Sequence, residues 1–144
     1  MRHLKGLTLI TNSLEILHEM SGQEGWNIIS TGGSMRGDVM ALTGPHALRT
    51  IRCYHVRFAF LSCRGINTRL GIADSSDDIV QVKQAMVEAA DCAVLLADHR
   101  KFDRAGLVSL GPLGTVARIV TDREPPAEWK TRFEELEIAL YDNH

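Results

Sequence analysis

The sequence predicts an α/β fold in which helices flank a mainly parallel, Rossmann-like sheet. Apolar runs of strand length alternate along the chain with segments whose apolar residues recur at helical spacing. The run from 92 to 97 is apolar throughout, as expected for a strand of a parallel sheet that is covered on both faces. Because strands and helices alternate, successive strands are expected to run in the same direction.

The expected elements follow one another along the whole chain. Strands are expected at residues 7–10, 26–31, 56–62, 92–97, 107–110, 116–121 and 137–141. Helices are expected at 14–20, from 45 to about 54, at 77–90 and from 125 to 136. Glycine-containing loops or turns are expected at 32–38, 63–67 and 111–114.

The helix at 77–90 carries the clearest pattern. Ile79, Val82 and Met86 recur at helical spacing and form one apolar face. Asp77 and Asp78 place negative charge at the positive end of the helix dipole. The strand expected at 92–97 follows this helix, and the polar loop 98–102 follows that strand directly. The loop is a candidate site.

Composition limits the classes of function. A chain of 144 residues suits a single domain over residues 1–144, and its net charge of −2 argues against a protein that coats nucleic acid by itself. Cys53, Cys63 and Cys92 are widely spaced without a CxxC pair, which indicates free thiols in a cytoplasmic protein. The histidines are scattered, so we expect no metal and no cofactor. No apolar run reaches the roughly 18 residues of a membrane helix.

Three strand ends carry polar turns. They are residues 11–13, Arg64 with Gly65, and 98–101. If the strands are parallel neighbours, these turns line one rim, where ligands of open α/β sheets bind. Amides, a few cations and a carboxylate at such a rim suit a small anionic polyol such as a sugar phosphate. The alternative for Asp98 to Lys101 is a solvated loop.

The first turn and the glycine pair each allow two interpretations. Thr11, Asn12 and Ser13 precede a helix, so they either present amides to phosphate or form an ordinary helix cap. The pair Gly32 and Gly33 lets the backbone approach a ligand closely, with Arg36 as a forked donor to phosphate. The alternative is a plain turn with an exposed arginine.

Seven segments, taken together and in order, resemble the C-terminal effector-sensing domain of DeoR-family bacterial transcriptional regulators. They are LTLITNSLEIL (7–17), STGGSMR (30–36), LTGPHAL (42–48), FAFLSCRGIN (58–67), VKQAMVEAA (82–90), LLADHRKF (95–102) and IVTD (119–122). The resemblance implies a fold similar to sugar-phosphate isomerases and glucosamine-phosphate deaminases. It also implies a sensor of phosphorylated sugars or related metabolites, which reaches DNA only through an absent or partner helix-turn-helix domain.

The resemblance also implies a set of ligand-binding residues. They are Thr11, Asn12, Ser13, Gly32, Gly33, Arg36, Gly65, Lys83, Asp98 and Lys101. Gly65 would allow close backbone approach, Lys83 and Lys101 would supply positive charge, and Asp98 would accept from sugar hydroxyls. The alternative is that Lys83 and Asp98 pair with each other.

Departures from the family pattern favour a sensor over an enzyme. Arg64, Asn67 and Ile79 stand where members of the family commonly carry carboxylates. Proton transfer in an isomerase or deaminase needs a base over the substrate carbon, so we expect no catalytic residues. The enzyme remains the alternative function, as does a remnant that binds nothing.

The start of the chain is the other departure. It begins after the family's first strand and helix-turn-helix, with residues 1–6 as the end of a preceding helix, as expected if either the chain or its gene has been shortened. The strand edge left exposed predicts a homo-oligomer.

Overall fold

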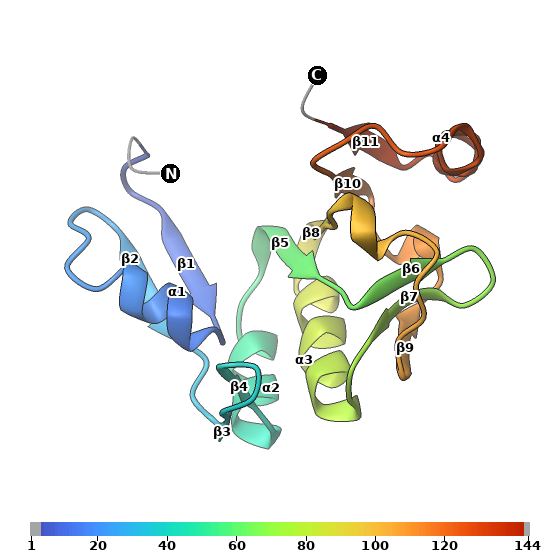
Figure 1. Ribbon diagram of the computed structural model, residues 1–144. Helices are drawn as coiled ribbons and strands as arrows, with labels where there is room; N and C mark the ends of the chain where they lie inside the picture. The colour runs from blue at the N-terminus through green and yellow to red at the C-terminus, as the bar shows by residue number, and fades with distance from the viewer. Residues whose placement is uncertain (1–3, 143–144) are drawn as a thin grey trace. The chain divides into compact units, whose positions relative to one another are not determined.

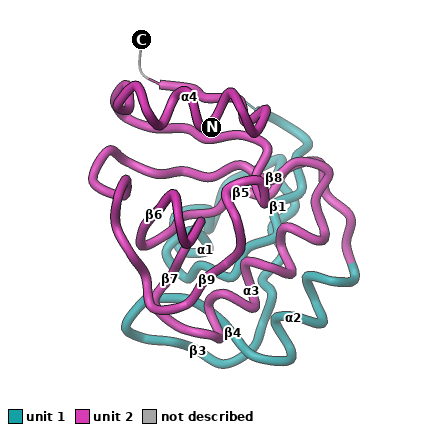
Figure 2. Tube along the Cα trace, turned by 90° about the vertical axis from the view of Figure 1, so that its right-hand side faces the viewer, with its two compact units in different colours: residues 1–53 teal, residues 54–144 magenta. Residues whose placement is uncertain are grey.

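Parallel strand pairing dominates the structure, as the alternation of strands and helices predicts. The computed structural model describes residues 4–142 and divides into two compact units, Met1–Cys53 and Tyr54–His144 (Figure 2). Each unit is described by itself below. The interpretation of residues 1–144 as one domain stays a prediction.

The first unit contains a parallel strand pair joined through a short helix. β1 (Thr8–Thr11) pairs in parallel with β2 (Asn27–Ser30), and α1 (Leu14–Glu19) lies between them in the chain. These elements confirm the strand, helix and strand expected there. Of the helix expected at residues 1–6, residues 1–3 lie outside the described part, and residues 4–6 are not helical.

The rest of the first unit contains a hairpin that the sequence did not predict. β3 (Ser34–Arg36) pairs antiparallel with β4 (Ala41–Thr43), and α2 (Pro45–Arg52) follows as expected. The loop expected at 34–38 is therefore wrong. Strands of three residues are too short to show alternation, and the preceding glycine pair has the composition of a turn.

The second unit is built on a four-stranded sheet in which every pair is parallel (Figure 1). The strand order is β11-β10-β8-β5. The strands are β5 (Val56–Ser62), β8 (Ala90–Leu96), β10 (Arg118–Val120) and β11 (Ala139–Tyr141). The helices are α3 (Asp77–Glu88) and α4 (Ala127–Glu135). The predicted fold class, α/β with a mainly parallel sheet and flanking helices, is confirmed.

A second, antiparallel sheet stands beside the parallel one. It contains β6 (Gly65–Asn67), β7 (Gly71–Asp74) and β9 (Val108–Gly111), in the order β6-β7-β9. The turn expected at 63–67 is wrong, because β6 begins at Gly65, and β7 was missed. All four residues of β7 are buried, so the strand has no alternation of polar and apolar residues. Its last residue, Asp74, is of a type that commonly caps helices, so the sequence pattern assigns it to the start of the next helix.

The core explains why one face of the parallel sheet is covered. Val80 of α3 and Trp129 of α4 belong to the same buried cluster as Leu95 of β8. Both helices therefore contribute to this buried cluster. Leu96 is 45% exposed, so the prediction that the strand 92–97 is covered throughout on both faces is wrong. No helix within residues 4–142 has the length and apolarity needed to cross a membrane.

Candidate functional site

The carboxyl ends of β5 and β8 lie side by side. Ser62 at the end of β5 pairs in register with Leu96 at the end of β8. The turn at Arg64 and the short 3₁₀ helix η1 (His99–Lys101) leave these two strands, so they share one edge of the sheet. Two of the three polar strand ends expected at one rim are thus brought together. The turn at 11–13 belongs to the other unit, and its place in this rim stays a prediction.

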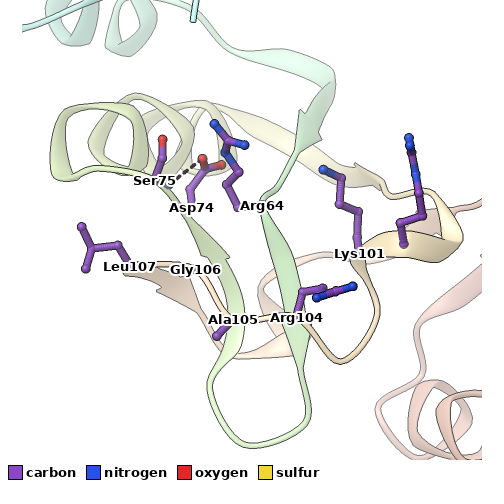
Figure 3. A pocket seen from close by; sticks show the side chains of 9 residues that line it. Arg64, Asp74, Ser75, Lys101, Arg104, Ala105, Gly106 and Leu107 are labelled. Atoms are coloured by element: carbon purple, nitrogen blue, oxygen red, sulfur yellow. Dashed lines mark hydrogen bonds between the residues drawn. The ribbon is translucent and has the colours of Figure 1, made fainter. Parts of the chain in front are cut away.

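A pocket of about 650 Å³ opens at this edge (Figure 3). That volume lies within the usual range for small-molecule sites, about 300–1,000 Å³. Four of the side chains around it are cationic and one is a carboxylate. The lining residues are Arg64, Asp74, Ser75, Arg100, Lys101, Arg104, Ala105, Gly106 and Leu107.

Asp98 is the N-cap of η1 and is hydrogen-bonded to its neighbour Arg100. The Oδ1 atom of Asp98 accepts from the backbone N–H of Arg100 at 2.9 Å, and Oδ2 lies 2.9 Å from the Arg100 Nη2. The hydrogen bond from the Arg100 side chain is the main cause that lowers the pKa of Asp98 to about 2. Asp98 therefore caps η1 as an ionised group.

Two contacts hold η1 in place. Asp122, after β10, accepts from the backbone N–H of His99 and contacts its Nδ1, both at 2.7 Å. These hydrogen bonds, with that of the imidazole the larger, lower the pKa of Asp122. On the other side Phe102 is buried, with its ring centroid 5.2 Å from that of Trp129 in an edge-on arrangement. The segment that carries Lys101 is therefore anchored at both ends.

Lys83 of α3 forms an ion pair with the buried carboxylate of Asp74. Its Nζ lies 2.5 Å from Asp74 Oδ2 and donates to the carbonyl of Ser62 at 2.7 Å. Asp74 is only 6% exposed, and its Oδ1 accepts from the backbone N–H of Ser75. A carboxylate this deeply buried needs a paired cation. The alternative pairing of Lys83 with Asp98 is therefore wrong, because each has another partner.

Gly65 permits a close approach, and the group that approaches is the chain's own backbone. A Cβ atom at Gly65 would lie 2.3 Å from the carbonyl oxygen of Arg104. Gly106 is similar, since its Cβ would lie 2.8 Å from the Cβ of Ala73. The two glycines let the segment after η1 pack directly on β6 and β7, which brings Arg104 to the pocket.

Three of the four cations at the pocket keep their charge available. Within residues 4–142, the side chains of Arg64, Lys101 and Arg104 make no hydrogen bond or ion pair. Arg100 is paired with Asp98, and the carboxylate of Asp74 is paired with Lys83. With these two pairs counted as neutral, the pocket carries a net charge of about +3 from Arg64, Lys101 and Arg104, and Asp98 also attracts Lys101.

Cys63 lies beside this site as a buried thiol. Burial is the main cause that raises the pKa of Cys63 to about 11, although the positive charge of Lys83 opposes the shift. Cys63, Cys53 and Cys92 are all free, which confirms the expectation of free thiols. Cys63 is neutral at physiological pH and serves as a small apolar core residue.

The turn predicted at 11–13 has local structural partners in the first unit. Ser13 caps α1, because its Oγ accepts from the backbone N–H of Ile16. Thr11 Oγ1 accepts from the backbone N–H of Ser13, and Asn12 donates to the carbonyl of Leu42. The helix that follows has six residues. The structure thus shows the helix-cap arrangement, and a role of the three residues in ligand binding stays a prediction.

The glycine pair and Arg36 also lie in the first unit. Gly33 has φ of 110°, and a Cβ there would lie 2.4 Å from the carbonyl oxygen of Thr43, so glycine is required for the hairpin to pack. Gly32 has φ of 64° with open space around its Cβ position. Arg36 forms a two-pronged ion pair with Asp38. Binding of a ligand by these residues remains a prediction.

Of the ten predicted binding residues, Lys101 lines the pocket, while Gly65, Lys83 and Asp98 support it from behind. Arg64, which stands where members of the family commonly carry a carboxylate, also lines the pocket. Arg104 was missed because the segment 103–107 has no periodic pattern. Asp74 was missed as a site residue because its partner is found only after β7 is placed.

The comparisons with known proteins agree with one another. The family model for the DeoR C-terminal sensor domain matches residues 1–123. A Bacillus subtilis protein, the uncharacterized HTH-type transcriptional regulator YulB, is 36% identical over 116 residues, which are 81% of this chain and 45% of that protein. The L-fucose operon activator of Haemophilus influenzae is 29% identical over 131 residues, 91% of this chain and 53% of that protein.

The glycerol-3-phosphate regulon repressor of Escherichia coli is 28% identical over 120 residues, 83% of this chain and 48% of that protein. The chain spans about half the length of the curated relatives it matches. These relatives are all transcriptional regulators. Since the family model covers most of the chain, this protein belongs to the family of DeoR C-terminal sensor domains.

Proposed function

We propose that the pocket of the second unit binds a phosphorylated sugar or a related small anionic metabolite, and that the protein is a sensor and not an enzyme. The observation that carries this proposal is a set of three cations, Arg64, Lys101 and Arg104, around a pocket at the carboxyl edge of a parallel sheet. Their side chains make no hydrogen bond or ion pair with the part of the chain that the structure describes.

The charge of the pocket suits a phosphate monoester. Such a group carries about −1.5 to −2 charge at pH 7 and three acceptor oxygens. The planar forks of Arg64 and Arg104 match two phosphate oxygens at a time, and the ammonium of Lys101 acts as a point charge. An uncharged sugar would leave all three cations without a partner.

The anchoring of η1 supports tight binding. Asp122 holds His99 at one end of the segment, and the packing of Phe102 on Trp129 holds the other end. The backbone that carries Lys101, between these two anchors, loses little conformational freedom when a ligand binds. Pre-ordering of this kind raises affinity by reducing the entropic cost of association.

The state of the carboxylates favours sensing over catalysis. Among the described residues that line the pocket, Asp74 is the one carboxylate, and it is buried and paired with Lys83. An isomerase or deaminase would need a base within hydrogen-bond reach of the substrate carbon. A carboxylate already engaged by an ammonium and an amide N–H is poorly suited to accept that proton.

The relatives support a role in regulation. Two of them are named as an L-fucose operon activator and as a glycerol-3-phosphate regulon repressor. We propose that this domain senses a metabolite of similar chemistry, and that DNA is contacted through a helix-turn-helix domain other than this one. The homo-oligomer, and ligand binding by residues of the first unit such as Arg36, are also proposals.

A thermal-shift experiment tests the proposed ligand class. The protein is heated with glucose 6-phosphate, fructose 6-phosphate or glycerol 3-phosphate, and with each unphosphorylated counterpart. A ligand present at about 100 times its dissociation constant stabilises the folded state by about 2.7 kcal/mol. We expect stabilisation by one or more phosphorylated compounds and none by the counterparts.

Two variants locate the binding. The double substitution Arg64→Gln with Lys101→Gln removes two cations of the pocket, so the shift should disappear. Arg69→Gln removes an exposed cation in the turn between β6 and β7 that is not among the lining residues, and should leave the shift intact. A shift that survives the double substitution, or a panel in which no phosphorylated compound binds, would overturn the proposal. Turnover of a bound sugar phosphate, followed by NMR and abolished in Asp98→Ala, would establish the enzyme instead.

A further inference from the structure

The charges around the pocket exceed what one phosphate neutralises. Arg64, Lys101 and Arg104 are unpaired within the described residues, and the pairs Arg100–Asp98 and Lys83–Asp74 are each neutral. A phosphate monoester supplies about −1.5 to −2 charge, so a bound sugar monophosphate leaves about one positive charge without a partner. The remaining charge favours a second anionic group on the ligand.

The three cations come from separate segments and do not converge on one point. Arg64 follows β5, Lys101 belongs to η1, and Arg104 lies in the segment after η1. In Figure 3 the guanidinium groups of Arg64 and Arg104 extend in different directions, and the Lys101 side chain is drawn to the right of Arg64 and above Arg104. With about 650 Å³ available, the pocket has room for a sugar-sized ligand between two anion subsites.

The carboxylates at this edge are already engaged. Asp98 accepts from Arg100, both oxygens of Asp74 have partners, and Ser75 supplies a side-chain hydroxyl to the lining. Asn67, at the end of β6, uses its Oδ1 to accept from the backbone N–H groups of Arg69 and Leu70. Recognition of the ligand therefore depends on its charged ends more than on its hydroxyl groups.

We propose that this pocket selects a phosphorylated sugar derivative with a second anionic group, either a second phosphate or a carboxylate. Arg64 and Arg104, whose guanidinium groups extend in different directions, each hold one anionic group, and Lys101 adds positive charge to the pocket. This inference rests on the proposed function, because it names the ligand class of the same site. The position of Arg104 depends on Gly65, which admits the backbone of Arg104 at a distance that no side chain would allow.

Matched ligand pairs test the inference by titration calorimetry at constant ionic strength. Fructose 6-phosphate is compared with fructose 1,6-bisphosphate, and glucose 6-phosphate with 6-phosphogluconate. Each pair differs by one anionic group, so the pairs distinguish a second phosphate from a carboxylate. We expect the doubly anionic member of at least one pair to bind about tenfold more tightly, the effect of one additional charge-assisted contact.

Variants assign the second subsite. Arg104→Gln should reduce the preference within the pair to about twofold or less while the monophosphate still binds. Arg104→Lys keeps the charge and should retain most of the preference. Arg69→Gln is the matched control and should change neither member. The unfolding temperature of each variant shows that the fold is intact.

The outcomes separate this inference from the function on which it rests. If the monophosphates bind and the doubly anionic compounds bind equally well, the inference is wrong and the proposed function stands. If the preference persists in Arg104→Gln, the assignment of the second subsite is wrong. If no phosphorylated compound binds, the proposed function fails, and this inference fails with it.

Discussion

Replacing Lys83 by methionine isolates the role of the buried pair at the back of the pocket. The side chain of Lys83 is 16% exposed and that of Asp74 is 8% exposed, so both charges are largely removed from water. Methionine keeps much of the aliphatic length of lysine and removes its charge and its hydrogen bonds. The substitution therefore leaves Asp74 as a buried carboxylate without a cation.

The expected cost follows from that exposure. Breaking a buried ion pair by removing one partner costs about 3–5 kcal/mol, because the remaining charge stays uncompensated. A domain of this size is stable by only about 5–15 kcal/mol, so the loss is a large fraction of the total. We expect Lys83→Met to lower the free energy of unfolding by that amount, measured by urea denaturation followed by circular dichroism.

A second substitution separates the charge from the packing. Asp74→Asn removes the negative charge and keeps an oxygen that accepts from the backbone N–H of Ser75. In the double variant with Lys83→Met, we expect recovery of more than half of the lost stability. Lys101→Met serves as the control, because Lys101 has no ion pair within the described residues, and it should change stability by less than about 0.5 kcal/mol.

The reasoning is refuted if Lys83→Met costs less than about 1 kcal/mol, the size of an exposed ion pair. It is also refuted if the double variant is as unstable as Lys83→Met alone. Loss of sugar-phosphate binding without loss of stability would show that Lys83 contacts the ligand, as the family resemblance implies, and does not mainly serve Asp74.

Three further predictions concern the surroundings of the pocket. Gly65→Ala should destabilise the protein by about 1–3 kcal/mol in thermal unfolding, because its Cβ would lie 2.3 Å from a backbone carbonyl oxygen. The control Gly114→Ala, whose Cβ would have no atom within 4 Å, should be close to neutral, and equal effects of the two substitutions would contradict the packing described for Gly65. The exposed Cys53 should react with a thiol reagent at pH 8 while Cys63 reacts only after unfolding, because burial raises its pKa to about 11; rapid labelling of Cys63, read by mass spectrometry, would oppose this. The pKa of Asp122 is lowered, so its ionised form stabilises the fold above the ordinary carboxyl pKa and this contribution is lost as pH falls through the folded value. The free energy of unfolding of Asp122→Asn should therefore fall less between neutral pH and about pH 2 than that of the unsubstituted protein. If the free energy of unfolding of the two proteins falls equally over this range, the contact between Asp122 and His99 does not stabilise the fold.

Elements with strong local patterns were predictable from the sequence. The strand Val56–Ser62 and the helix Asp77–Glu88 carry long apolar runs or clear helical spacing, and both appear at nearly the expected bounds. The strands that were missed, β3, β4, β6 and β7, are short and lie beside or begin at Gly33, Gly44, Gly65 and Gly71, so their composition is that of turns. These strands depend on pairing with distant segments, which no local pattern records.

The site was predictable only in part for the same reason. Polar residues at strand ends pointed correctly to the edge where Arg64 and Lys101 meet. The partner of Lys83 could not be deduced, because Asp74 reaches it from a strand of the antiparallel sheet. Arg104 was also missed, because its position depends on contacts with Gly65, thirty-nine positions earlier in the chain.

The most direct test of the central claim is an amide NMR titration of the 144-residue chain with a sugar phosphate identified by thermal shift. The account predicts that the largest chemical-shift changes fall on Arg64, Lys101, Arg104 and their sequence neighbours, with a smaller change at His99. It also predicts that the unphosphorylated sugar changes none of these signals. Saturating ligand that leaves these amides unmoved, or that moves only residues remote from the pocket, would contradict the assignment of the sensor site.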